Sequence, residues 1–263
     1  MKKTLLLVLA LIASGCADAR QSALCEGLSV GSPLDDVRTC AEQGDLRAQF
    51  NLGLMYEMGE GVPEDFVEAV RWWRLAAEQG DLRAQYNLGY MYDTGEDVPQ
   101  DFVEAVRWYR LAAEQGAASA QYNLGLMYAN GTGVPEDDTE AVRLYRLAAE
   151  QGHAPAQNNL GLMYANGRGV PEDDTEAVRW YRLAADQGDA SAQYNLGFMY
   201  ADGDGVPQDM VLAYMWWNLA AAQGHENAQR SKDILEEQMT REQIAEGQRL
   251  SREWLEAHPP GGN

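Results

Sequence analysis

The sequence predicts an all-α solenoid of five helical hairpins, each 36 residues long, with a helical cap at either end. Two observations carry this prediction. First, the tripeptide Glu-Gln-Gly or a close variant recurs at a constant step of 36 residues, and a period of this length is typical of stacked supersecondary units. Second, every repeat holds two apolar stretches with helical spacing, separated by a Gly- and Pro-containing turn. The five repeats are 45–80, 81–116, 117–152, 153–188 and 189–224.

The first helix of each repeat, helix A, is defined by an apolar face and a glycine stop. In the first repeat this face is expected to hold Ala48, Leu52, Met55 and Tyr56, which recur at helical spacing. Helix A should end at Gly59, because glycine readily adopts the left-handed conformation that closes a helix. The residues that follow, 60–63, read Glu-Gly-Val-Pro and predict the turn of the hairpin.

The second helix of each repeat, helix B, is expected to begin at an acidic version of the capping box. In the first repeat Asp65 and Glu68 form this pair, and it recurs as Asp101/Glu104, Asp137/Glu140 and Asp173/Glu176. Helix B then stops at Gly80. The side chains that it is expected to bury are Ala69, Trp73, Ala76 and Ala77.

The outer face of helix B predicts where the stack ends. In the first repeat it carries charges spaced so that Glu68 can pair with Arg71, and Arg74 with Glu78. The same four positions stay charged through the fourth repeat, but in the fifth they are Leu212, Met215, Asn218 and Ala222. A solvated face has no reason to lose four charges together, so we expect something apolar to cover it.

The segment 225–257 is the expected cover and forms the carboxy-terminal helical cap. It predicts one helix over about 228–238 and another from Thr240, where Gln243 completes a capping box. The apolar side chains that it offers are Leu235, Ile244, Leu250 and Trp254. Residues 258–263 are expected to form a disordered tail.

Three motifs in the repeats resemble a known family. They are Ala-x-x-x-Leu-Gly-x-x-Tyr in helix A, Gly-x-Gly-Val-Pro in the turn, and Ala-x-x-Trp/Tyr-x-x-Ala-Ala in helix B. Together they are similar to the Sel-one-like repeat, a relative of the tetratricopeptide repeat, over residues 45–224. Residues 25–44 resemble a shortened capping half-repeat. The resemblance implies a right-handed superhelix of α-hairpins that scaffolds protein complexes, often in bacterial envelopes.

The start of the chain predicts export. Two lysines precede a short apolar run, Leu5 to Ile12, which is too short to span a bilayer and therefore indicates a signal peptide over 1–15. The next residue, Cys16, ends a stretch that resembles the bacterial lipobox, so it is the expected site of lipidation, with a tether over 16–24. An ordinary cleavage site at 17–19 is the alternative. The expected location is the periplasm, anchored to the outer membrane, although sorting to the inner membrane stays open.

Export also bears on the two remaining cysteines. Cys25 and Cys40 form an even pair in an oxidising compartment, within one short segment where a covalent link adds most. We therefore expect a disulfide between them in the amino-terminal cap. Two buried free thiols are the alternative.

The charge balance disfavours two classes of binding partner. The chain has 41 acidic residues against 20 Lys and Arg, a net charge of -21. Without a basic stripe, binding to nucleic acid is disfavoured, and so is direct contact with anionic lipid heads. We expect a soluble monomer that meets the membrane only through its lipid anchor and whose partner is another envelope protein or peptide.

No catalytic constellation, cofactor site or metal site is predicted. The three histidines, His153, His225 and His258, lack a second ligand at metal-binding spacing on a shared helix face, and the first two are interpreted as solvated turn residues. The acidic turn 202–205 and the group Asp93, Glu96 and Asp97 only weakly resemble a calcium loop, because the later bidentate Glu is missing.

Aromatic residues at fixed positions of helix A give the candidate partner site. Tyr56 and its four counterparts do not vary between repeats, which is typical of packing between layers. Two other positions point away from the buried stripe and read Phe50/Leu54, Tyr86/Tyr90, Tyr122/Leu126, Asn158/Leu162 and Tyr194/Phe198. The alternative for this column is packing against the neighbouring repeat. As a hypothesis, Tyr86, Tyr90, Tyr122, Tyr194 and Phe198 contact a partner, because binding surfaces favour aromatic side chains.

The sequence thus favours a non-catalytic scaffold or adaptor of the envelope that binds proteins through the concave surface of the solenoid. An exported regulator that inhibits a sensor domain is an alternative that the sequence does not separate from it. An enzyme acting on β-lactams is a further alternative, because a cysteine-rich branch of the resembled family is linked to such compounds. Residues 45–224, however, contain no cysteine.

Overall fold

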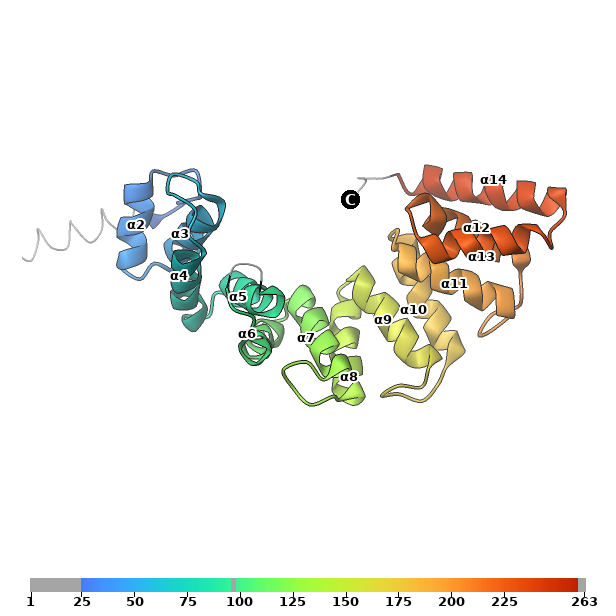
Figure 1. Ribbon diagram of the computed structural model, residues 1–263, viewed down its shortest axis with the longest axis horizontal. Helices are drawn as coiled ribbons and strands as arrows, with labels where there is room; N and C mark the ends of the chain where they lie inside the picture. The colour runs from blue at the N-terminus through green and yellow to red at the C-terminus, as the bar shows by residue number, and fades with distance from the viewer. Residues whose placement is uncertain (1–24, 96–97, 260–263) are drawn as a thin grey trace, which may run out of the picture. The chain divides into compact units, whose positions relative to one another are not determined.

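The computed structural model describes residues 25–95 and 98–259, and in these ranges the chain forms helices α2 to α14 and no strand (Figure 1). The helices are α2 (Leu34–Glu42), α3 (Leu46–Met58), α4 (Phe66–Glu78), α5 (Leu82–Thr94), α6 (Phe102–Glu114), α7 (Ala118–Asn130), α8 (Asp138–Glu150), α9 (Ala154–Ala165), α10 (Asp174–Asp186), α11 (Ala190–Asp202), α12 (Met210–Ala222), α13 (Glu226–Glu236) and α14 (Arg241–Ala257). The predicted signal peptide, Cys16 and its tether lie outside the described residues, as do Glu96, Asp97 and residues 260–263.

The helices pair as five α-hairpins, and the chain divides into two bodies. The first body ends at Gln115 and holds the hairpins α3/α4 and α5/α6, with α2 packed on α3 and α4 on α5. The second body starts at Gly116 and holds α7/α8, α9/α10 and α11/α12, with α8 packed on α9 and α10 on α11. The all-α solenoid of five hairpins that the sequence predicts is confirmed.

Each hairpin turn is held by an aspartate that works in two ways. The carboxylate of Asp65 accepts hydrogen bonds from the backbone N–H groups of Val67 and Glu68, which caps α4. Its own backbone N–H donates to the carbonyl of Tyr56 on α3 at 2.9 Å. The predicted capping box is therefore only half right, because the side chain of Glu68 does not return to Asp65 and instead pairs with Arg71 at 3.0 Å.

A close approach between the two helices explains the glycine of the Leu-Gly motif. A Cβ added to Gly53 would lie 2.4 Å from the ring of Trp73, so only glycine lets the ring rest on the α3 backbone. The indole N–H of Trp73 donates to the Phe50 carbonyl at 3.1 Å and fixes the ring there. The same contact recurs in the other hairpins as Gly89/Tyr109, Gly125/Tyr145, Gly161/Tyr181 and Gly197/Trp217.

Buried glutamines connect successive layers. Gln49 on α3 donates to the carbonyl of Ala41 at 3.2 Å and accepts from the side chain of Gln79, at the end of α4, at 2.7 Å. Both ends of its amide are thus paired, as a buried polar group requires. The inter-glutamine bond repeats along each body as Gln115 to Gln85, Gln151 to Gln121, Gln187 to Gln157 and Gln223 to Gln193. We call this set the glutamine ladder.

The charged face of helix B pairs differently from the prediction. The Glu68–Arg71 pair forms, and the guanidinium of Arg71 also lies over the ring of Trp72. Arg74, however, donates to the hydroxyl of Tyr92 on α5 at 2.5 Å and does not pair with Glu78. The phenol is the stronger competitor because it is half-buried, whereas an exposed ion pair gains little in water.

The last two helices pack on α12, the helix that has lost its charges. Leu250 and Trp254 of α14 pack against a buried cluster that includes Met215, and the predicted capping box of Thr240 and Gln243 forms at the start of α14. One boundary is corrected: His258, assigned to the tail, closes α14 and stacks on Trp254 with ring centroids 4.3 Å apart.

The amino-terminal segment is covalently closed. Cys25 and Cys40 form the disulfide that the sequence predicts, with their Cα atoms 5.7 Å apart. This link ties Cys25, which precedes the non-helical stretch 26–33, to α2, the helix that packs on α3. Asn51 of α3 adds a hydrogen bond from its side chain to the backbone carbonyl of Leu28 at 2.9 Å. None of the helices in the described residues is long and apolar enough to cross a bilayer.

Candidate binding surface

The two predicted rows of helix A residues differ in exposure. In the first row Tyr86, Tyr122 and Tyr194 are half-buried, and Phe50 and Asn158 are buried. In the second row Tyr90 is 46% exposed and Phe198 is 38% exposed. The second row therefore presents the more accessible rings, while the first row serves partly as core.

Packing on helix B accounts for the burial of the first row. The ring of Tyr86 lies 5.9 Å from that of Tyr109, and the ring of Tyr122 lies 6.0 Å from that of Tyr145, centroid to centroid. Both pairs are tilted contacts in the range that aromatic rings prefer. Substituting Tyr86 or Tyr122 would therefore remove core contacts as well as surface.

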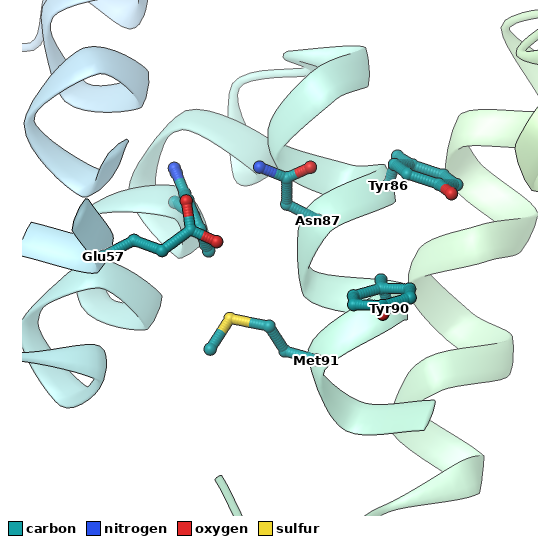
Figure 2. Close-up of a pocket in the computed structure, with 6 residues that line it drawn as sticks. Glu57, Tyr86, Asn87, Tyr90 and Met91 are labelled. Atoms are coloured by element: carbon teal, nitrogen blue, oxygen red, sulfur yellow. The ribbon is translucent and has the colours of Figure 1, made fainter. Parts of the chain in front are cut away.

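In the first body the structure brings Tyr86 and Tyr90 together at a pocket. Figure 2 shows it between α3 and α5, and its volume is about 170 Å³. Its lining residues are Glu57 of α3, Trp73 of α4, and Tyr86, Asn87, Tyr90 and Met91 of α5. Cavities that hold cofactors or drug-sized ligands are usually about 300–1,000 Å³. This pocket fits one side chain better than such a ligand.

In the second body Tyr194 and Phe198 belong to an aromatic cluster. Their rings meet edge to face at 5.0 Å, and Phe198 also meets the ring of Trp217 at 5.2 Å. The indole N–H of Trp217 donates to the Tyr194 carbonyl at 3.0 Å, which fixes the geometry. Phe198 is the most accessible ring of this cluster, because Tyr194 is half-buried and Trp217 is buried.

Two histidines are not the solvated turn residues that the sequence analysis assumed. The Nδ1 atoms of His153 and His225 accept the backbone N–H groups of Ala156 and Ala228, so both residues are helix N-caps. Their rings also pack on the candidate column: His153 makes a tilted contact with Tyr122 at 4.9 Å, and His225 stacks on Tyr194 at 4.6 Å, centroid to centroid. The partner ring lies 31 residues away in sequence, in the preceding hairpin, which is why local sequence reasoning missed it.

Burial dominates the electrostatics of this surface. Burial and then the charge of Asp189 raise the pKa of Tyr122, partly offset by a hydrogen bond with Asn159. Burial raises the pKa of Tyr145 to about 12, and it lowers the pKa of His153. Burial also raises the pKa of Asp93, which accepts from the Tyr109 hydroxyl at 3.4 Å. These shifts keep the phenols and the imidazole neutral at physiological pH and favour packing over acid–base chemistry.

Metal ligation is likewise not supported by the described part of the chain. Across residues 25–95 and 98–259, no group of three His, Cys, Asp or Glu side chains converges closely enough to hold an ion.

Sequence reasoning missed a column of asparagines beside the aromatic one. Each helix A carries an asparagine directly after the first-row position, and its side chain is half-buried in every repeat. The five are Asn51, Asn87, Asn123, Asn159 and Asn195. The signal was available, because an invariant polar residue at a step of 36 has no reason to persist on a purely solvated face.

Comparisons with known proteins agree with this architecture. The model of the Sel1 repeat family matches residues 46–81, 82–116, 118–153, 154–189 and 190–225, which are the predicted repeats shifted by about one residue. A Sel1 repeat protein from Oxalobacter formigenes shares 34% identity and a TM-score of 0.71, over 88% of this chain and 91% of that one. The comparison with curated proteins gives no match.

A second solved structure is similar over part of its length. It is c5321, described as a protective antigen present in uropathogenic Escherichia coli strains and displaying an SLR fold, with 30% identity and a TM-score of 0.59. The match covers 86% of this chain but 56% of that one. Five matched repeats, the recurring glycine–aromatic contact and the likeness in fold lead to one conclusion: this chain belongs to the Sel1 repeat family, whose solenoids generally act as scaffolds for protein–protein interaction and are typically non-catalytic.

Proposed function

We propose that this chain is an exported adaptor of the bacterial envelope, lipid-anchored through Cys16, that holds another protein on its helix A surface. The observation that carries the proposal is the row of exposed rings on that surface, Tyr90 at 46% and Phe198 at 38%. Rings of this size are held in place by packing, so they offer contact area at little cost in side-chain entropy.

Two further observations support the envelope part of the proposal. The chain starts with residues typical of a signal peptide and a lipidation site. It also carries the Cys25–Cys40 disulfide, and disulfides persist in oxidising compartments such as the periplasm. The adaptor is proposed to act as a monomer, anchored to the outer membrane.

Site-specific photo-crosslinking in intact cells tests the partner surface. A photoreactive phenylalanine analogue would replace Tyr90 or Phe198. Val67, which lies on α4, a helix B, and is 73% exposed, would be replaced in the same way as the matched control. We expect one protein to be captured from the two helix A positions and not from Val67. Equal capture from all three positions, or capture from Val67 alone, would contradict the proposed surface.

Detergent partitioning tests the anchor independently. The wild-type chain should enter the detergent phase, and Cys16→Ala should move it to the aqueous phase because the acyl chains are its only proposed membrane contact. A wild-type chain that partitions into water would refute the anchor without bearing on the partner surface.

A further inference from the structure

The pocket in the first body holds a recognition element that the first hairpin already uses internally. Asn51 of α3 binds the backbone carbonyl of Leu28, which lies in a non-helical stretch, at 2.9 Å. The helix A surface of the first hairpin thus holds an irregular segment of backbone through an asparagine amide. Because an amide side chain offers both donors and an acceptor, it matches the donor and acceptor of a peptide unit.

Asn87 is the counterpart of Asn51 one hairpin further along. It holds the position of Asn51 in the second repeat and lines the pocket, and its side-chain amide makes no hydrogen bond with another residue in the described ranges. In the second body, by contrast, Asn158 donates to the Asn159 side chain at 3.4 Å and accepts from Asn195 at 2.9 Å. A half-buried amide with no partner gains by binding a peptide backbone.

A contact of Phe50 indicates which kind of group binds at the aromatic position before the asparagine. The guanidinium of Arg83 lies 4.0 Å from the centre of the Phe50 ring, a cation–π contact. Tyr86 replaces Phe50 in the second repeat, but the counterpart of Arg83 is Ser119. The chain therefore provides no equivalent cation of its own at that sequence position.

Charge and size at the pocket complete the argument. Among the residues that line it, Glu57 brings a carboxylate and none brings a cation, while Tyr90 and Met91 give apolar walls. A volume of about 170 Å³ equals that of five or six water molecules, which is room for a long single side chain. The acidic chain, with a net charge of -21, adds a general attraction for cations.

We propose that this pocket takes a lysine or arginine side chain from an extended segment of the partner, while Asn87 binds the adjacent backbone as Asn51 binds Leu28. This inference rests on the proposed function and deepens it, because it states the chemistry of the partner. The cation meets the Glu57 carboxylate and the faces of Tyr86 and Tyr90, and its methylene stem lies against Met91.

A random ten-residue peptide library, selected on the full chain, tests the proposal with a defined probe. We expect the selected peptides to share a lysine or arginine at one position. Binding of one selected peptide is then measured by fluorescence anisotropy against Asn87→Ala and Glu57→Gln, each of which should weaken it about tenfold. N-methylation of the peptide backbone next to the basic residue should weaken binding to the wild type in the same way.

Matched controls remove the same chemical groups outside the pocket. Asn130→Ala removes an exposed asparagine outside the column, and Glu60→Gln removes an exposed carboxylate in the turn after α3, so both should leave the affinity unchanged. Thermal unfolding of every variant establishes that it is folded. Selected peptides without a basic position, or an affinity that neither pocket variant alters, would overturn the proposal.

Failure of the pocket proposal can be distinguished from failure of the proposed function. If crosslinking from Tyr90 persists in the Asn87→Ala and Glu57→Gln chains, the proposed adaptor function is kept and the proposed recognition of a basic side chain is refuted. No crosslinked protein from the wild type, together with a basic peptide bound at Asn87, would refute the adaptor and keep the pocket.

Discussion

Replacing Gly161 by alanine probes the contact that sets the spacing of the two helices in the fourth hairpin. An added Cβ would lie 2.7 Å from the Tyr181 ring and 3.2 Å from the carbonyl oxygen of Ala177, whereas ordinary contacts are 3.4–4 Å. The Tyr181 ring is almost fully buried, so it has no space to turn away. One neighbour is a buried ring and the other is backbone, so α9 and α10 must move apart.

Two opposing effects give the magnitude. Alanine is a better helix former than glycine by about 1 kcal/mol, which would stabilise α9. Overpacking of a filled core costs about 1–3 kcal/mol, and the buried ring and the backbone oxygen together place this site at the upper end. We therefore expect Gly161→Ala to lower the free energy of unfolding by about 1–2 kcal/mol.

Urea unfolding followed by circular dichroism measures this change, with the same substitution in a Tyr181→Leu background as the control. Leucine removes the ring, so there Gly161→Ala should be neutral or stabilising, and the two substitutions should not add. If Gly161→Ala alone stabilised the wild-type chain by about 1 kcal/mol, helix propensity would be the whole effect and the steric reasoning would be wrong.

Three further predictions concern helix ends and the disulfide. Ala117 caps α7 without a side-chain bond, whereas Asp189 at the same repeat position accepts from Ala192; Ala117→Asp should therefore raise stability by about 1 kcal/mol in urea titrations, and an unchanged midpoint would contradict this. Reducing the Cys25–Cys40 bond, which spans 15 residues, should lower stability by about 3 kcal/mol, visible as a lower melting temperature that a double serine variant reproduces without reductant. Burial lowers the pKa of His153 below its ordinary value of 6.5. As the pH falls, His153 is therefore protonated in the unfolded chain at a higher pH than in the folded chain. The stability that neutral His153 contributes is complete above about pH 6.5 and falls as the pH drops below it. Urea midpoints at about pH 7.5 and about pH 5.5 should show a loss that is smaller in His153→Asp, and equal losses in both chains would refute the assignment.

The fold could be predicted from the sequence because the same helix boundaries recur in five repeats, so each assignment could be compared between them. The helix A stop at Gly59 and the start of helix B at Asp65 both hold, since glycine and a capping aspartate act through neighbouring backbone. The disulfide was also predictable, because few pairings are open to two cysteines in one short segment.

The candidate site was only partly predictable because it depends on contacts between repeats. Tyr90 and Tyr86 were identified, and the recurrence of asparagine every 36 residues could have pointed to Asn87. Glu57, by contrast, is not repeated along the chain and carried no signal that separated it from surface residues. His153 was misread for the same reason, since its ring packs on a residue of the preceding hairpin. Contacts of this range follow from how layers stack, and residue periodicity alone does not specify them.

The glutamine ladder has a consequence for how chains of this kind can change in length. The pairs Gln79–Gln49 and Gln115–Gln85 each join residues 30 positions apart. The glutamine that comes first in the sequence, Gln49 or Gln85, also donates to a backbone carbonyl 8 positions earlier. Duplicating or deleting 36 residues preserves both separations, so every amide finds a partner again. Inserting one residue inside a helix rotates the amide off its partners and leaves a buried polar group unpaired, at a cost of about 1–3 kcal/mol. Genes of this kind should therefore lengthen and shorten by whole hairpins, while single-residue insertions collect in the turns.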